Sequence, residues 1–136
     1  MACLLPSDKT MKNSIEDSLA ITQALETYFT GVYEGSIIML NAVYHPCTLL
    51  FGDVKGQPYT KTLVLYLGGV AHRQSPKDSG KPFEREVISV SVINSIAVAR
   101  IRVRMYDFNY HEFLSFHKTD NRWLIVNKMI TQVSDL

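Results

Sequence analysis

The sequence predicts one α+β domain, with helices first and a curled antiparallel sheet after them. Residues 13–34 carry apolar side chains at steps of three and four, which is the spacing of a helix with one buried side. From Phe83 onward, runs rich in β-branched and aromatic residues are separated by links of two or three residues. The length of 136 residues suits one domain. We expect residues 1–12 to form a flexible tail and residues 13–136 to form the domain.

Composition narrows the classes of function. Apolar residues make up 46% of the chain and charged residues 20%, which is typical of a globular protein. The net charge of +1 gives no sign of nucleic acid or an acidic membrane as partner. No apolar run approaches the ~18 residues of a membrane span. Two cysteines and no signal-peptide pattern favour a reducing compartment, and we expect a cytoplasmic location.

The helical elements can be placed from their start and stop signals. Asn13 and Ser14 stand three residues before acidic side chains, the spacing of a capping box, and predict the start of the long helix. Gly35 predicts its end. The elements expected next are a short helix over 36–44, a strand over 48–51, a third helix over 60–70 and a polar loop over 74–82.

Four strands are then predicted, over 83–93, 96–106, 110–118 and 123–133, with turns at 94–95, 107–109 and 120–121. This register places Arg104 opposite Glu112 on one face. Both faces of the sheet come out largely apolar, whereas a sheet with one wet face should alternate apolar with polar residues. We therefore expect helices on one face and a second copy of the chain on the other, as a homodimer.

The order of elements resembles the nuclear transport factor 2-like superfamily, which includes ketosteroid isomerase and SnoaL-type cyclases. The C-terminal run resembles the family labelled "putative lumazine-binding", in the segments Tyr110-His111-Glu112-Phe113-Leu114, Lys118-Thr119-Asp120-Asn121 and Trp123-Leu124-Ile125-Val126-Asn127-Lys128. The resemblance implies a cone-shaped, cystatin-like α+β fold around a ligand-binding pocket, and a homodimer formed through the convex face of the sheet. We expect no cofactor.

The chain departs from this family pattern at three places. Asn121 stands where the family often has glycine, and Glu112 where it usually has aspartate. Near Phe51, where isomerase-type relatives carry a base, the first carboxylate is Asp53. No catalytic set is therefore assigned, and no cysteine, histidine and acidic residues fall at metal-ligand spacing.

The strongest candidate site is the Arg104–Glu112 pair, because a buried guanidinium needs an acidic partner. It can orient a polar planar ligand, or it can be a structural pair at the end of the sheet. Tyr28 is expected to offer a pocket hydroxyl, because the long helix should cross the mouth of the cone. His45 could act as a base, or bond a helix end. The full set predicted to bind ligand is Tyr28, His45, Phe51, Arg104, Tyr106, Tyr110, Glu112 and Asn127.

Three hypotheses of function remain open. The first is an uncharacterised, homodimeric domain that binds an unidentified small molecule in a pocket with one Arg/Glu pair. The second is an isomerase, dehydratase or cyclase that moves a proton next to a carbonyl, with Glu112 as base and Arg104 stabilising the oxyanion. The third is an interaction module that holds a partner chain on the second sheet face. The fold alone cannot decide among them.

Overall fold

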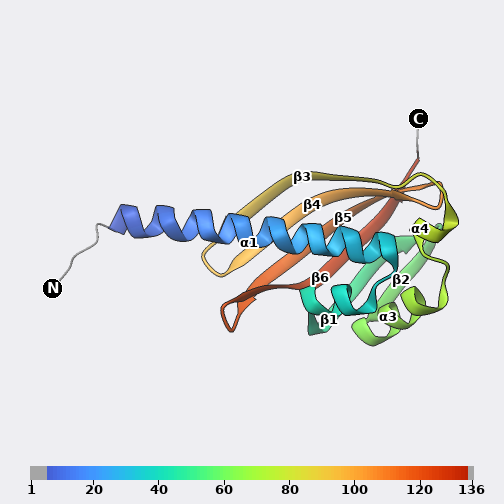
Figure 1. The fold of residues 1–136 in the computed structure, drawn as a ribbon, viewed down its shortest axis with the longest axis horizontal. Coiled ribbons are helices and arrows are strands. Elements are labelled where there is room, and N and C mark those ends of the chain that lie inside the picture. The colour runs from blue at the N-terminus through green and yellow to red at the C-terminus, as the bar shows by residue number, and fades with distance from the viewer. Residues whose placement is uncertain (1–5, 135–136) are drawn as a thin grey trace.

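The computed structural model describes the backbone of residues 6–134 and the side chains from residue 14 onward. In this range the elements are α1 (Pro6–Glu34), α2 (Ile37–Val43), β1 (Tyr44–Val54), β2 (Gln57–Thr62), α3 (Leu63–His72), α4 (Pro76–Ser79), β3 (Glu84–Ile93), β4 (Ile96–Met105), β5 (Phe108–Thr119) and β6 (Arg122–Val133). They are drawn in Figure 1. None of these helices combines the length and apolarity that a membrane crossing would need.

The strands form one sheet in the order β2-β1-β6-β5-β4-β3. The α+β class and the predicted sequence of four C-terminal strands are confirmed. The sheet is not wholly antiparallel, however, because β1 runs parallel to β6. Two short elements were not foreseen: β2 occupies part of the segment predicted as the third helix, and α4 lies in the predicted polar loop.

The long helix begins earlier than predicted. Its first residue is Pro6, not Asn13, so the described part of the expected tail, residues 6–12, has helical backbone. Proline suits a first helical position, because its missing N–H would have no partner there. The predicted capping signal at Ser14 and Asp17 is not used as a cap. Residues 1–5 of the expected tail lie outside the described residues, and the division into a flexible tail and a domain stays a prediction.

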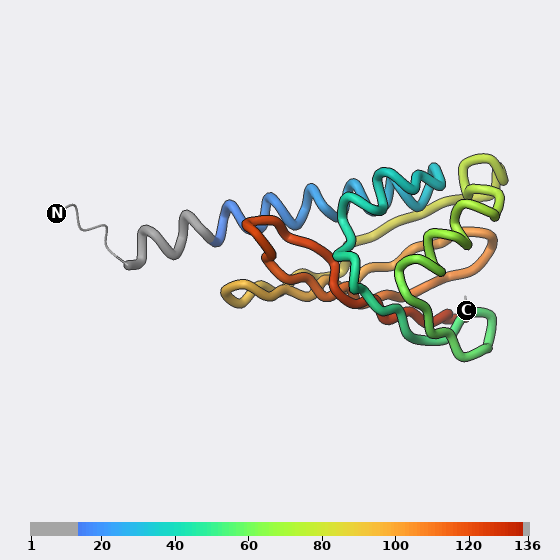
Figure 2. Tube along the Cα trace, turned by 90° about the horizontal axis from the view of Figure 1, so that it is seen from below, coloured from blue at the N-terminus to red at the C-terminus, as the bar shows by residue number. Residues whose placement is uncertain are grey.

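The helices cover the concave face of the sheet. Figure 2 shows the sheet curling beneath α1, with α3 closing one end. The C-terminal half of α1 buries Ile21, Leu25, Tyr28, Phe29 and Val32. Its N-terminal half extends beyond the sheet (Figure 1), which leaves Ile15 and Leu19 exposed although the periodic stripe predicted them to be buried.

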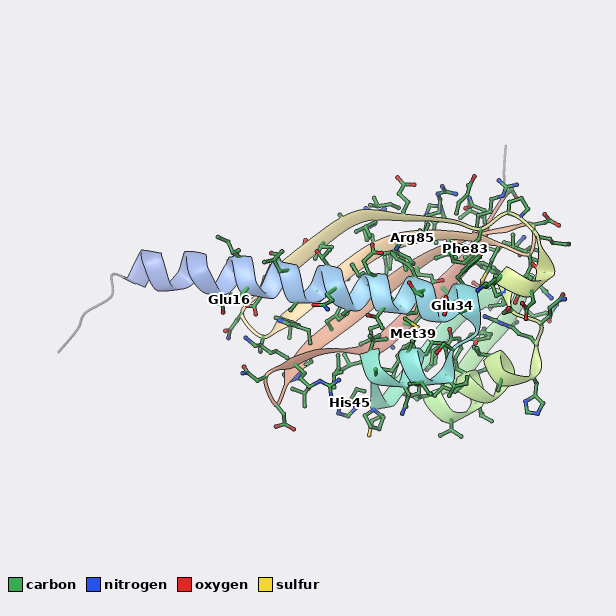
Figure 3. The ribbon with its side chains drawn as sticks, in the orientation of Figure 1. Glu16, Glu34, Met39, His45, Phe83 and Arg85 are labelled. Atoms are coloured by element: carbon green, nitrogen blue, oxygen red, sulfur yellow. The ribbon has the colours of Figure 1, made fainter. Side chains whose placement is uncertain are left out.

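The edge strand β3 is fastened to α1 by side chains. Arg85 forms an ion pair with Glu26 at 2.6 Å, and its guanidinium lies 5.0 Å from the centre of the Phe29 ring. Phe83 packs on Tyr33, with ring centres 4.9 Å apart. Phe83 and Arg85 both lie on the β3 side of α1 in Figure 3. These contacts hold the helix against the sheet and so fix the roof of the concave side.

The register between β4 and β5 differs from the predicted one. The turn consists of Tyr106 and Asp107, both with positive φ, as in a two-residue type I′ hairpin, and not of residues 107–109. Arg104 therefore lies opposite Asn109, while Glu112 lies opposite Ile101. The shift is an odd number of residues, so it moves one partner to the other face. The predicted Arg104–Glu112 pair is wrong: Glu112 faces the helices and Arg104 faces away from them.

A bulge in β6 produces a second change of face. Phe116 pairs with Ile125, as the predicted two-residue turn at 120–121 requires, but Ser115 then pairs with Asn127, which leaves Val126 as an extra residue. Beyond the bulge, Leu114 lies opposite Lys128 instead of Asn127. An inserted residue reverses which side chains point inward. Lys128 consequently points into the concave side, and Asn127 points outward.

Candidate functional site

A cavity of about 580 Å³ opens at the end of the molecule where α3, α4 and the β4–β5 turn meet. This end lies on the right in Figures 1 and 2. The walls come from β1, β2, α3, β4, β5 and β6. The residues that line it are Val54, Lys55, Tyr59, Lys61, Tyr66, Gly69, Val70, Arg73, Gln74, Lys81, Met105, Tyr106, Phe108, Tyr110, Lys128 and Ile130.

The floor of the cavity is a buried chain of three polar side chains. The Tyr28 hydroxyl donates a hydrogen bond to Glu112 Oε1 at 2.5 Å. Lys128 Nζ forms an ion pair with the same oxygen at 3.6 Å. Glu112 and Lys128 are each only 3% exposed. Lys128 is among the residues that line the cavity and Glu112 is not, so the lysine is the member of the ion pair that borders the cavity.

Lys128 carries its charge inside an aromatic enclosure. Its Nζ lies 4.7 Å from the centre of the Tyr66 ring and 5.4 Å from that of Tyr28. Burial acts to lower the pKa of Lys128, but the attraction of the Glu112 carboxylate, together with smaller contributions from Tyr66 and Tyr59, outweighs it, and the net pKa is raised. The lysine is therefore charged at neutral pH.

The tyrosines around the site remain protonated at neutral pH. Burial raises the pKa of Tyr59 and of Tyr110, and raises those of Tyr28 and Tyr44 well above the ordinary value. Their hydroxyls are therefore hydrogen-bond donors throughout the physiological range. The Tyr44 hydroxyl, fully buried beneath Tyr66, has no hydrogen-bond partner among the described residues.

Positive charge dominates the cavity walls. Among the described residues, no aspartate or glutamate lines the cavity. Five cationic side chains do: Lys55, Lys61, Arg73, Lys81 and Lys128. Three of them lie close to aromatic rings: Lys55 at 5.5 Å from Phe108, Lys61 at 5.2 Å from Tyr59 and Arg73 at 5.5 Å from Tyr106. Lys81 pairs with Asp107 at 2.8 Å, beside the opening.

Half of the residues predicted to bind ligand belong to this region. Tyr106 and Tyr110 line the cavity, and Tyr28 with Glu112 supports its floor. The Tyr106 hydroxyl is engaged with the backbone carbonyl of Gln74, which ties the β4–β5 turn to the segment between α3 and α4.

The other four predicted residues lie elsewhere. Phe51, Arg104 and Asn127 are on the convex face, where Asn127 donates to the Leu49 carbonyl at 3.0 Å. His45 lies at the start of β1, away from the α3–α4 end (Figure 3). Its Nδ1 accepts a hydrogen bond from the Cys47 backbone N–H at 3.0 Å, so it organises its own strand and not a helix end.

Several residues of the cavity were not predicted as ligand contacts. Lys128 was placed on neither face, because the bulge at Val126 leaves no clear signal in the sequence. Tyr59 and Tyr66 are also absent from the predicted set of ligand-binding residues. The one signal that could have found Lys128 is a lysine in the middle of a mostly apolar strand, because a buried ammonium group requires a carboxylate partner.

The residues present suit binding more than metal or acid–base chemistry. Among the described residues, no three histidine, cysteine or acidic side chains come close enough to hold a metal ion. The buried carboxylate is already engaged by a phenol and an ammonium group. What the cavity offers is flat aromatic surface, neutral phenol donors and positive charge.

Solved structures with this architecture carry the nuclear transport factor 2-like fold. An NTF2-like protein of unknown function from Silicibacter pomeroyi DSS-3 superposes with a TM-score of 0.79 at 19% identity, over 88% of this chain and 98% of the other. Similar proteins of unknown function from Shewanella baltica OS155 and Methylobacillus flagellatus KT give TM-scores of 0.77 and 0.75 at 16% and 20% identity. They cover 89% and 88% of this chain and 97% and 94% of theirs. The chain therefore has an NTF2-like fold.

The sequence places the chain more closely within that fold class. Residues 16–131 match the family described as "Putative lumazine-binding", and the chain belongs to that family. None of the curated proteins matches it. The resemblance noted in the C-terminal run is thus confirmed.

Proposed function

We propose that this protein is a non-catalytic domain that binds a small aromatic molecule in the cavity above Lys128. The observation that carries the proposal is the cavity itself: about 580 Å³, open at one end and closed at its floor by a fully paired polar chain. Ligand pockets of proteins have volumes of roughly 300–1,000 Å³ and combine aromatic walls with a few polar groups. The family description supports lumazine, a flat bicyclic heteroaromatic compound, as the first ligand to test.

Binding is favoured over proton transfer by the position of Glu112. A general base must reach the proton that it abstracts, within about 2.6–3.2 Å or through one water. Glu112 Oε1 accepts from Tyr28 and faces Lys128, and the carboxylate does not line the cavity. The proposal keeps Tyr106 and Tyr110 as wall contacts and assigns Tyr28 and Glu112 to support of the floor.

Gly69 gives a sharp test of the cavity. It lies on α3 and lines the cavity, and a Cβ built on it would have Lys61 Nζ as its nearest neighbour, at 3.8 Å. Gly69→Leu should therefore project a side chain into the cavity beside Lys61 and obstruct it without a backbone clash. It should not weaken the helix, because leucine favours helices more than glycine. The matched control is Gly68→Leu on the preceding residue, where an added Cβ meets nothing within 4 Å.

The measurement is a titration of ¹⁵N-labelled protein with lumazine, followed by the amide signals of α3 and β2. We expect these signals to shift in the wild type and in Gly68→Leu, and not in Gly69→Leu. Shifts confined to the convex face, or shifts that persist unchanged in Gly69→Leu, would overturn the assignment of this cavity.

We further propose that the protein forms a homodimer through the convex face of its sheet. We also propose that it is cytoplasmic. Support comes from Leu49, Phe51, Phe113 and Met129, large apolar side chains that are 41–48% exposed on that face. Phe51 and Phe113 both pair with Met129, so they lie on three neighbouring strands as one patch. Contiguous exposed apolar surface of this kind marks interaction sites.

A further inference from the structure

We propose that the ligand of this cavity is an anion: an aromatic acid whose ring lies against the tyrosines and whose carboxylate, sulfonate or phosphate group meets the cationic side chains. This inference rests on the proposed binding function and names the chemical class of the ligand. It follows from a mismatch between the positive and negative groups of the site.

The cationic groups of the cavity exceed its anionic groups. Five cationic side chains line it, and two carboxylates compensate them: Asp107 pairs with Lys81, and Glu112 pairs with Lys128. Lys55, Lys61 and Arg73 form no ion pair with any side chain from residue 14 to residue 134. Like charges gathered around a concave surface repel one another and focus a positive potential into it. A bound anion would relieve that repulsion.

The alternative to an anion site is that these cations are long, solvated side chains at the rim, whose aliphatic stems cover apolar surface. Lys55 and Arg73 are exposed, and this reading could account for them alone. It accounts less well for Lys61, which is half-buried with its Nζ beside Gly69 inside the cavity, and for Lys128 at the floor. Charge therefore runs from the mouth of the cavity to its base.

The hydroxyl groups of the walls complement the same ligand. The hydroxyls of Tyr59 and Tyr110 donate to no described residue. Because burial raises the pKa of both phenols, they stay neutral donors and do not repel an anion. A neutral donor and a cation on one anionic group give charge-assisted hydrogen bonds, which are stronger than neutral ones.

The test uses two compounds with one aromatic skeleton. 8-Anilinonaphthalene-1-sulfonate and N-phenyl-1-naphthylamine differ only in the sulfonate group. We expect both to shift the Gly69 amide signal, and the sulfonate to bind about tenfold tighter, which corresponds to one charge-assisted hydrogen bond. The double variant Lys61→Met/Arg73→Met should abolish that preference. The control Lys77→Met/Arg100→Met has the same net charge but changes residues outside the cavity, and it should keep the preference.

The outcomes separate the two proposals. Equal affinity of the two compounds at Gly69 would overturn the anionic class and leave the binding function standing. A preference for the sulfonate that survives in Lys61→Met/Arg73→Met would also overturn it, because the selected charge would then lie elsewhere. Failure of both compounds to shift Gly69 would overturn the anionic class together with the cavity as a binding site.

Discussion

Lys128 and Glu112 show how single residues set the character of the cavity. A lysine inside an apolar sheet is tolerated here because Glu112 compensates its charge and two aromatic rings surround it. The desolvation of both groups is costly, so such a pair contributes little net stability while its disruption is severe. The ion pair instead holds a positive group in a fixed position at the base of the cavity.

Removal of the lysine alone should therefore destabilise the fold strongly. We expect Lys128→Met to lower the free energy of unfolding by about 3–5 kcal/mol, because it leaves the Glu112 carboxylate buried without a cation. The double variant Lys128→Met/Glu112→Gln should be more stable than Lys128→Met. Urea denaturation measures both, and Lys77→Met on the surface is the control, with a change within about 0.5 kcal/mol. A double variant less stable than Lys128→Met would contradict this account of the pair.

Stability should fall in alkaline solution. The pKa values of Tyr28 and Tyr44 lie well above the ordinary 10.0 and that of Lys128 above 10.5, so the folded state retains protons that the unfolded chain releases. Their contribution is complete below about pH 10 and is lost as the pH rises through the folded-state values. We expect a lower urea midpoint at pH 11 than at pH 9.

Tyr44→Phe isolates one part of this alkaline effect. The Tyr44 hydroxyl bonds to no described residue, so the variant removes an ionisable group without breaking a bond within the protein. We expect its stability to decline less between pH 9 and pH 11. A decline equal to that of the wild type would show that Tyr44 takes no part.

At the scale of elements, sequence patterns locate strands better than they fix registers. The two-residue turn at 120–121 was predicted from Asp120 and Asn121, both of which adopt positive φ. The turn before β5 was predicted one residue too late and one residue too long, because Tyr106 is an uncommon residue at positive φ. This error in the turn is the reason why Arg104 was predicted to lie in the cavity.

The parallel pairing of β1 with β6 depends on one glycine. Gly52 has φ +147° and lies beside Ile130, and an added Cβ would be 1.7 Å from the Ile130 carbonyl oxygen. Gly52→Ala should cost more than about 3 kcal/mol, since strain and overlap act together. Gly56→Ala has φ +75° but open space around it, and should cost roughly 1–2 kcal/mol. Equal losses in urea denaturation would show that close approach to β6 does not matter.

At the scale of the whole molecule, the two-sided sheet was predictable and the contents of its concave side were not. Strands with apolar residues on both faces indicate that both faces of the sheet are covered, and the described helices cover one of them. The cations of the cavity come from separate segments that only the curled sheet and α3 bring together. No spacing in the sequence connects Lys61, Arg73 and Lys128, so their convergence required the structure.

The proposed partner subunit on the convex face can be tested directly. We expect the wild type to sediment as a dimer at micromolar concentration and Phe113→Asp to sediment as a monomer, because a buried charge would be left without a partner. The control Ile38→Asp introduces the same charge at a residue that is 86% exposed on α2, away from the sheet, and should stay dimeric. A wild type that is monomeric would contradict the proposed homodimer.

The most direct test of the cavity is a crystal structure of the protein soaked with 8-anilinonaphthalene-1-sulfonate. We predict density for the ring system between α3 and β6, with the sulfonate within hydrogen-bonding distance of Lys61 or Arg73. Density found only on the convex face, with the space above Lys128 unchanged, would contradict the account.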